Sequence, residues 1–186
     1  MKLLIFLIAM VAGTHAQAPK YDYRVLATSK TSTLEKEMNE AASAGFVFVD
    51  AMGGQSALGG EEGIVVMVRE VGTLKLAQMK YKLLATNKTS TMEKEMQQLG
   101  DEGFDYKTQS VFSSSFGGQE VVVIMERDLA KPAKKIRYKL LATSKTSTMQ
   151  KELKQAGDAG FRAMGITVAK TAFGGNEVVA ILRSEE

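Results

Sequence analysis

The chain has 186 residues with no Cys, no Trp and a single His, His15, and its formal net charge is only +3. Because thiolate and imidazole ligands are almost absent, the composition argues against zinc, haem, blue-copper and iron–sulfur sites and against Ser-His or Cys-His nucleophiles, so we expect no metal and no cofactor. The weak charge argues against a nucleic-acid-binding protein, which would present a large basic stripe.

Residues 1–16 form the first predicted element, a secretory signal peptide. A basic residue precedes the apolar run Leu3–Ala12, which is too short to cross a bilayer and is followed by small residues. Thr14 and Ala16 stand at the small positions before a cleavage site, so we expect the mature chain to begin at Gln17 with a formal charge of +2. No second long apolar stretch follows. We therefore expect a soluble, exported protein, periplasmic or extracellular, without stable membrane insertion.

The rest of the chain is one unit written three times. Tyr23–Met38 returns as Tyr81–Met96 and again as Tyr138–Leu153, at offsets of 58 and 57 residues. Such a period indicates supersecondary units that bury apolar surface against their neighbours. Pooled cores suit a chain without disulfides, because about 50 residues are only marginally stable alone. We place unit 1 at 20–71, unit 2 at 79–128 and unit 3 at 136–186.

Each unit is expected to begin with a strand and continue into a helix. The strands are predicted at Tyr23–Thr28, Tyr81–Thr86 and Tyr138–Thr143. Ser32 and Glu35 have the spacing of a capping box, as do Ser90 with Glu93 and Ser147 with Gln150, which predicts a helix start at each serine. The spacing of Leu34, Met38 and Ala41 makes one apolar stripe along the helix. We expect each helix to end at a left-handed glycine, namely Gly45, Gly103 or Gly160.

Two strands joined by a glycine-rich turn complete each unit. In unit 2 they are Phe104–Phe112 and Val121–Arg127, with Phe116-Gly-Gly118 between them. The continuous apolar run Val121–Met125 predicts a central strand that is buried on both faces. We therefore predict an α+β fold of three tandem β-α-β-β repeats, each a three-stranded sheet of order 1-3-2 with antiparallel neighbours, covered by one helix.

The repeat resembles a bacterial domain-of-unknown-function family of small β-α-β-β modules, present here as three tandem copies over nearly all of residues 20–186. The resemblance is carried by the Tyr-led strand, the helix that ends in Gly-x-x-Gly-aromatic, and the apolar strand that closes near an Arg. Members commonly show Trp where this chain has Phe46, Phe104 and Phe161. The resemblance implies the fold and implies no activity, because the family carries none that is established.

The most strongly retained segment of the repeat is Ala-Thr-x-Lys-Thr-Ser-Thr. It places one lysine and several hydroxyl groups at a predicted helix N-terminus, where free amides and the helix dipole favour an anion. The alternative is that the serine and threonine cap the helix while the lysine is solvated. No glycine-rich loop precedes the segment, as a phosphate cradle would require. The candidate anion-binding residues are Lys30, Thr31 and Ser32 in unit 1, Lys88, Thr89 and Ser90 in unit 2, and Lys145, Thr146 and Ser147 in unit 3.

Three further features of the sequence give weaker indications of function than this segment does. The turn residues Leu58, Phe116 and Phe173 are either binding anchors or the edge of the core, and the second interpretation is the simpler. Asn87-Lys-Thr89 matches a glycosylation sequon in one unit only, so chance explains it. Carboxylates recur in every unit, and a pair of them would do acid–base chemistry only if a cleft brought two together. They are Glu62, Glu120 and Glu177 and, on the helices, Glu37, Glu95 and Glu152.

No catalytic motif emerges, and we expect no catalytic residues. Tandem copies multiply one surface and raise avidity, which favours a non-catalytic binding or interaction module whose partner is a protein or a small anionic ligand. A structural envelope component is the first alternative. A hydrolase that uses carboxylates is the second, and it has no motif in its support.

Overall fold

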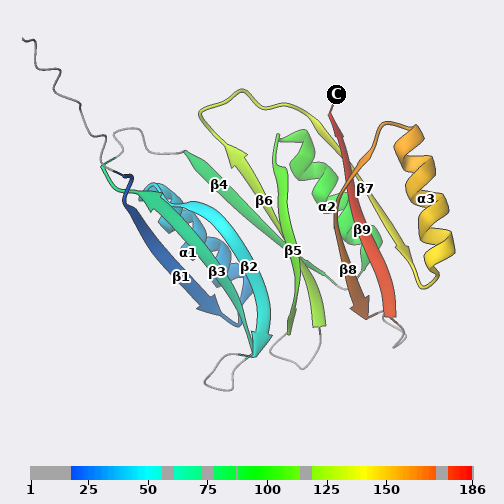
Figure 1. Ribbon diagram of the computed structural model, residues 1–186, viewed down its shortest axis with the longest axis horizontal. Helices are drawn as coiled ribbons and strands as arrows, with labels where there is room; N and C mark the ends of the chain where they lie inside the picture. The colour runs from blue at the N-terminus through cyan, green and yellow to red at the C-terminus, as the bar shows by residue number, and fades with distance from the viewer. Residues whose placement is uncertain are drawn as a thin grey trace, which may run out of the picture.

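The computed structural model describes residues 18–55, 61–72, 78–86, 88–113, 119–170 and 176–185. Each unit contributes a strand, a helix and two more strands (Figure 1). Unit 1 contains β1 (Tyr21–Thr28), α1 (Thr31–Ser43), β2 (Val47–Gln55) and β3 (Glu61–Glu70). Unit 2 contains β4 (Met79–Thr86), α2 (Thr89–Asp101), β5 (Asp105–Ser113) and β6 (Gln119–Asp128). Unit 3 contains β7 (Ile136–Thr143), α3 (Thr146–Asp158), β8 (Arg162–Lys170) and β9 (Asn176–Glu185).

The three sheets have the same topology. Their strand orders are β1-β3-β2, β4-β6-β5 and β7-β9-β8, and the central strand is antiparallel to both neighbours. The predicted α+β class, repeat arrangement and strand order are therefore confirmed. The apolar run of β6 is central as predicted, because all five residues from Val121 to Met125 are buried.

The helix ends confirm the glycine prediction. Gly45, Gly103 and Gly160 have φ values of 86°, 85° and 84°. At the end of α1 the amide of Phe46 donates to the carbonyl of Ala41 and that of Gly45 to Ala42, at 3.1 and 2.9 Å. This is the Schellman pattern, which only a residue at ease with positive φ closes without strain.

The helix starts contradict the capping-box prediction. The N-cap residues are Lys30, Lys88 and Lys145, none of which makes a side-chain cap hydrogen bond, and each serine is already inside the helix. The threonine two residues earlier takes part instead, since the hydroxyl of Thr86 accepts from the Lys88 amide at 3.1 Å. A hydroxyl at the end of the strand thus satisfies the turn before the helix, as in an ST-turn.

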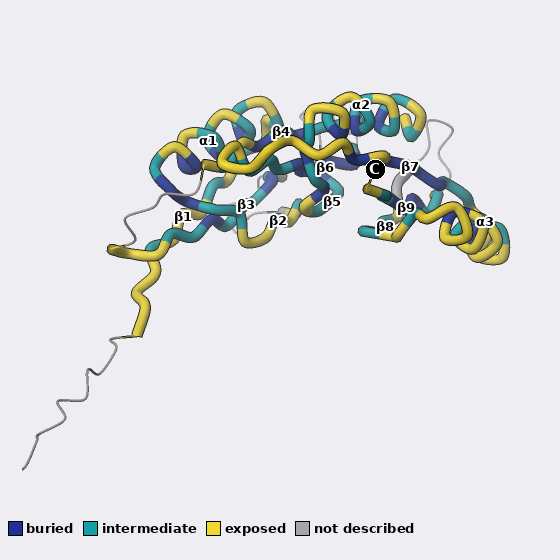
Figure 2. Tube along the Cα trace, turned by 90° about the horizontal axis from the view of Figure 1, so that it is seen from above, coloured by how far each residue is buried: buried dark blue, intermediate teal, exposed yellow. Residues whose placement is uncertain are grey.

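The helices α1 and α2 each lie between their own sheet and the next one. The first core cluster joins Leu34 and Met38 of α1 to Met67 of the first sheet and to Tyr81 and Ile124 of the second. The second cluster repeats this arrangement around α2, between the second and third sheets. The second strands of successive sheets also meet directly, β2 with β5 and β5 with β8. Figure 2 shows the result, a row of sheets with dark buried segments along β6 and β9 and a largely exposed α3 at one end.

Candidate functional site

The predicted anion-binding residues lie where the sequence placed them, at three helix starts, but on three separate helices. Lys30, Lys88 and Lys145 are the N-caps, and the threonine and serine that follow each lysine are the first two helical residues. Among the described residues no ion pair holds any of the three ammonium groups. The three segments therefore belong to three different units.

Several predicted features lie outside the described residues. They are the leader at 1–16, the glycine-rich turns with Leu58, Phe116 and Phe173, and Asn87 of the sequon. The repeated glutamates on helices and strands are partly exposed where they are described. Within the described ranges, no three acidic or imidazole side chains are placed to hold a metal ion. No described helix has the length and apolar character needed to span a membrane.

The junction between units 1 and 2 is built around Tyr81 of β4. Its side chain is fully buried. The Asn39 carboxamide of α1 donates to the Tyr81 carbonyl and accepts from the Tyr81 amide, both at 3.0 Å. One turn earlier, Glu35 accepts from the Leu83 amide at 2.9 Å. The Tyr81 hydroxyl in turn accepts from the Phe48 amide of β2 at 2.9 Å, so this one residue ties β4 to both α1 and the first sheet.

The junction between units 2 and 3 repeats this arrangement. Gln97 of α2, the equivalent of Asn39, accepts from the Tyr138 amide at 2.9 Å and donates to the Ile136 carbonyl at 3.3 Å. The Tyr138 hydroxyl donates to the Phe104 carbonyl at 3.0 Å and accepts from the Tyr106 amide at 2.9 Å. The repeated tyrosine is therefore the residue through which each unit is joined to the one before it.

The helices α2 and α3 carry glycine at equivalent positions, but the surroundings of the two glycines differ. A Cβ added to Gly100 would lie 2.2 Å from the Ile136 carbonyl oxygen and 3.0 Å from the Tyr138 ring, so α2 approaches β7 too closely for a side chain. A Cβ added to Gly157 would have no atom within 4 Å. Close packing thus explains the first glycine, and the second faces open space.

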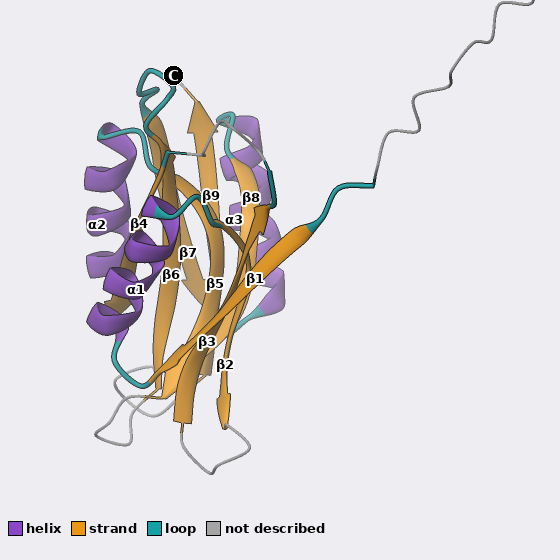
Figure 3. Cartoon of the chain, turned by 90° about the vertical axis from the view of Figure 1, so that its left-hand side faces the viewer, coloured by secondary structure: helices purple, strands orange, loops and turns teal. Residues whose placement is uncertain are grey.

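The first sheet presents the same surface with nothing over it. Tyr23 and Val25 of β1, the equivalents of Tyr81 and Leu83, are 60% and 68% exposed, against 0% and 9% in unit 2. We call this surface the open face. It consists of Tyr21, Tyr23 and Val25 on β1, Met52 on β2, and Ile64 and Val66 on β3, which the strand register places on one side. In Figure 3 the first sheet lies toward the viewer with β1 in front.

The other end of the molecule carries the counterpart of this surface, which we call the α3 face. It consists of Gln150, Lys154 and Gly157 on α3 and Ile166 and Val168 on β8, all of them exposed. Gln150 and Lys154 hold the positions of Glu35 and Asn39 in unit 1. Lys154 pairs with Asp158 of its own helix at 3.0 Å.

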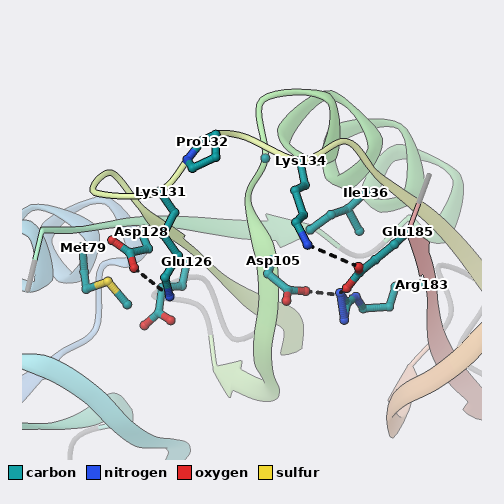
Figure 4. Close-up of a pocket in the computed structure, with 11 residues that line it drawn as sticks. Met79, Asp105, Glu126, Asp128, Lys131, Pro132, Lys134, Ile136, Arg183 and Glu185 are labelled. Atoms are coloured by element: carbon teal, nitrogen blue, oxygen red, sulfur yellow. Dashed lines mark hydrogen bonds and ion pairs between the residues drawn. The ribbon is translucent and has the colours of Figure 1, made fainter.

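A charged cleft of about 390 Å³ lies beside the linker between units 2 and 3 (Figure 4). Its carboxylates are neutralised by neighbouring cations. Arg183 Nε lies 3.2 Å from Asp105 without hydrogen-bond alignment, Lys131 lies 3.0 Å from Asp128, and Lys134 lies 3.9 Å from Glu185. The repeated glutamates that the sequence singled out do not line it. The Arg183–Asp105 pair joins unit 3 to unit 2, and the Lys134–Glu185 pair joins the linker to unit 3.

Burial raises the pKa of all three tyrosines at the junctions. The pKa of Tyr106 rises to about 12, and the pKa values of Tyr81 and Tyr138 rise further, in each case chiefly because burial disfavours the phenolate. Each phenol is neutral at physiological pH and works as a hydrogen-bonding group.

Sequence reasoning missed Asn39 and Gln97, which hold the units together. The signal was present in the alignment of the repeats, where an amide stands four residues after Glu35 and Glu93 while Lys154 stands at the same position in unit 3.

Comparison of the chain with protein-family models, with curated proteins and with solved structures gives no match in any of the three.

Proposed function

We propose that this chain is an exported, non-catalytic interaction protein that binds an amphipathic helix on the open face of its first sheet. The observation that carries the proposal is the contrast between equivalent residues. Tyr23 is 60% exposed, whereas Tyr81 and Tyr138 are 0% and 5% exposed under the helix of the preceding unit. An apolar surface of this kind, rimmed by polar residues, marks an interaction site.

The internal junctions define the chemistry of the ligand. A helix that fits would carry a carboxylate at one position, an amide four residues later and a small residue after that, as Glu35, Asn39 and Ala42 do in α1. The amide satisfies the backbone of an exposed edge strand, and the apolar stripe covers the tyrosine. Binding of this kind adds a helix to a sheet face without any chemistry.

A peptide of residues 29–46 tests the proposal directly. Isolated helices of this length are marginal in water, so the peptide is stapled by a lactam between Lys36 and Glu40, which are exposed and 3.8 Å apart in α1. The labelled peptide should bind the full chain, measured by fluorescence anisotropy. Replacing Asn39 by Ala in the peptide should weaken binding about tenfold, because two hydrogen bonds are lost.

The matched control lies on the receptor. Tyr23→Glu places a charge on the open face and should abolish binding, whereas Lys20→Glu, also exposed but outside that face, should leave it unchanged. No binding to the parent chain, or equal binding by the Asn39→Ala peptide, would show that the open face does not receive such a helix.

The helix starts support a second proposal, that each Lys-Thr-Ser segment binds a small anion. The finding that favours this proposal argues against helix capping, which is the simpler explanation for the segment. Ser32 and its equivalents do not cap their helices, so capping does not account for their retention. Amides of the first helical turn and one cation are present at each site.

A further inference from the structure

We infer that the helix received by the open face is α3 of a second copy of this chain, so that copies associate head to tail. The inference rests on the proposed function and names its partner. Each junction within the chain joins a helix and second strand of one unit to a sheet of the next. The two surfaces left over, the α3 face and the open face, are the two halves of a third such junction.

The exposed apolar residues support this pairing. Nine large hydrophobic residues are exposed among the described residues, and Tyr21, Tyr23, Val25, Met52, Ile166 and Val168 belong to one or other of these two faces. Ile166 and Val168 of β8 stand where Gln109 and Val111 of β5 meet the third sheet. Apolar surface is therefore concentrated where the next copy would pack.

Gly157 supplies an independent observation. In α2 the equivalent Gly100 admits the Ile136 carbonyl and the Tyr138 ring, whose equivalents on β1 are Tyr21 and Tyr23. In α3 the same space is empty. The glycine that close packing requires is present, and the strand that would require it is supplied by the second copy.

One substitution makes this junction weaker than those within the chain. Lys154 can donate to the Tyr23 carbonyl but cannot accept from the Tyr23 amide, as Asn39 and Gln97 do for their tyrosines. The contact is heterologous, since different surfaces meet, so it generates open chains of copies or a ring rather than a closed dimer. Association should therefore be reversible and concentration-dependent.

Sedimentation velocity across a concentration series tests the inference with the full chain. The parent should sediment faster as its concentration rises. Tyr23→Glu blocks the open face, and Gly157→Gln blocks the α3 face; both positions are exposed, so the monomer folds. Each variant alone should remain monomeric. Mixed in equal amounts they should form a one-to-one complex, because each retains the half that the other lacks.

A variant that strengthens the association tests the inference without relying on substitutions that block it. Gln150→Glu with Lys154→Asn gives α3 the polar pair of α1 and should tighten association about tenfold. Lys151→Asn, at a position whose equivalents stay exposed in α1 and α2, is the matched control and should change nothing. A parent chain that is monomeric throughout, or a mixture that forms no complex, would overturn the inference. If the stapled peptide still binds in that case, the receptor function stands and only its partner is wrong.

Discussion

The side chain of Asn39 forms with the backbone of Tyr81 the two hydrogen bonds that a neighbouring strand would form. One carboxamide donates to the carbonyl and accepts from the amide of the same residue, each at 3.0 Å. β4 is the edge of its sheet, and an unpaired edge is a template for association with other chains. A single amide on a helix therefore closes this edge and fixes which helix covers it.

Removing that amide should weaken the junction between units 1 and 2. Asn39→Ala leaves the Tyr81 amide and carbonyl unpaired and should lower the free energy of unfolding by about 1–3 kcal/mol. Urea titration followed by circular dichroism measures the change. Gln98→Ala, at an exposed position of α2, is the control and should stay within about 0.5 kcal/mol of the parent. Equal effects would show that the amide does not hold the junction.

Gly100→Ala and Gly157→Ala should change stability in opposite directions. Alanine favours the helix by about 1 kcal/mol at both sites. At Gly100 the new methyl group would lie 2.2 Å from the Ile136 carbonyl, so the clash should outweigh this gain and cost about 1–3 kcal/mol. At Gly157 nothing in the single chain opposes it, so the midpoint of thermal unfolding should rise at concentrations where the chain is monomeric. A stabilised Gly100→Ala protein would mean that α2 and β7 are not in close contact.

Alkaline pH should loosen the junctions. The buried Tyr138 has a pKa raised above its ordinary value of 10.0, so the unfolded chain ionises first as the pH rises. Its contribution is intact below about pH 10 and is lost above it, at up to about 1.4 kcal/mol per pH unit. Urea midpoints between about pH 8 and about pH 11, with tyrosinate absorbance as a second signal, measure the effect. Tyr138→Phe should reduce the pH dependence, leaving the part due to Tyr81 and Tyr106, while it lowers stability at neutral pH.

The turn before each helix should depend on threonine and not on serine. Thr86→Val removes the acceptor of the Lys88 amide and should cost about 0.5–1 kcal/mol. Ser90→Ala should stay within about 0.5 kcal/mol of the parent, because Ser90 is already helical and does not cap. Both are read from urea midpoints, and the reverse order of effects would restore the capping box.

Phosphate should stabilise the chain if the helix starts bind anions as proposed. By mass action the gain is about 2.7 kcal/mol at a hundredfold excess over Kd. Chloride at matched ionic strength controls for screening, which acts with either salt. The triple change Lys30→Gln, Lys88→Gln, Lys145→Gln should remove the difference between the two salts. Identical melting curves in phosphate and chloride would end the proposal.

The repeats and their hydrophobic pattern were enough to predict the fold. The apolar run Val121–Met125 required a strand buried on both faces, and the 1-3-2 order followed. The positive φ of Gly45 followed from its place after the apolar stripe. These features are local, or depend only on how many faces of an element are apolar, and a single sequence carries both kinds of information.

The junctions were not predicted because their contacts join residues far apart in the chain. Ser32 and Glu35 have the spacing of a capping box, yet Glu35 bonds the Leu83 amide, 48 residues away. Glu35 therefore makes a tertiary contact in place of the local capping-box contact, and the spacing of the residues does not reveal this. Likewise Gly157 matches Gly100 in sequence, and only the structure shows that one is packed and the other exposed.

The packing of α1 and α2 against the following sheet also sets an order of assembly during synthesis. Leu34 and Met38 pack in one core cluster with Tyr81 and Ile124 of unit 2. Since domains generally fold as the N-terminal part emerges first, α1 keeps an apolar side uncovered until the whole of unit 2 has been made. Units 1 and 2 thus each complete their packing only after the next unit has been made, and a chain stopped between units would expose the surface that the missing unit covers.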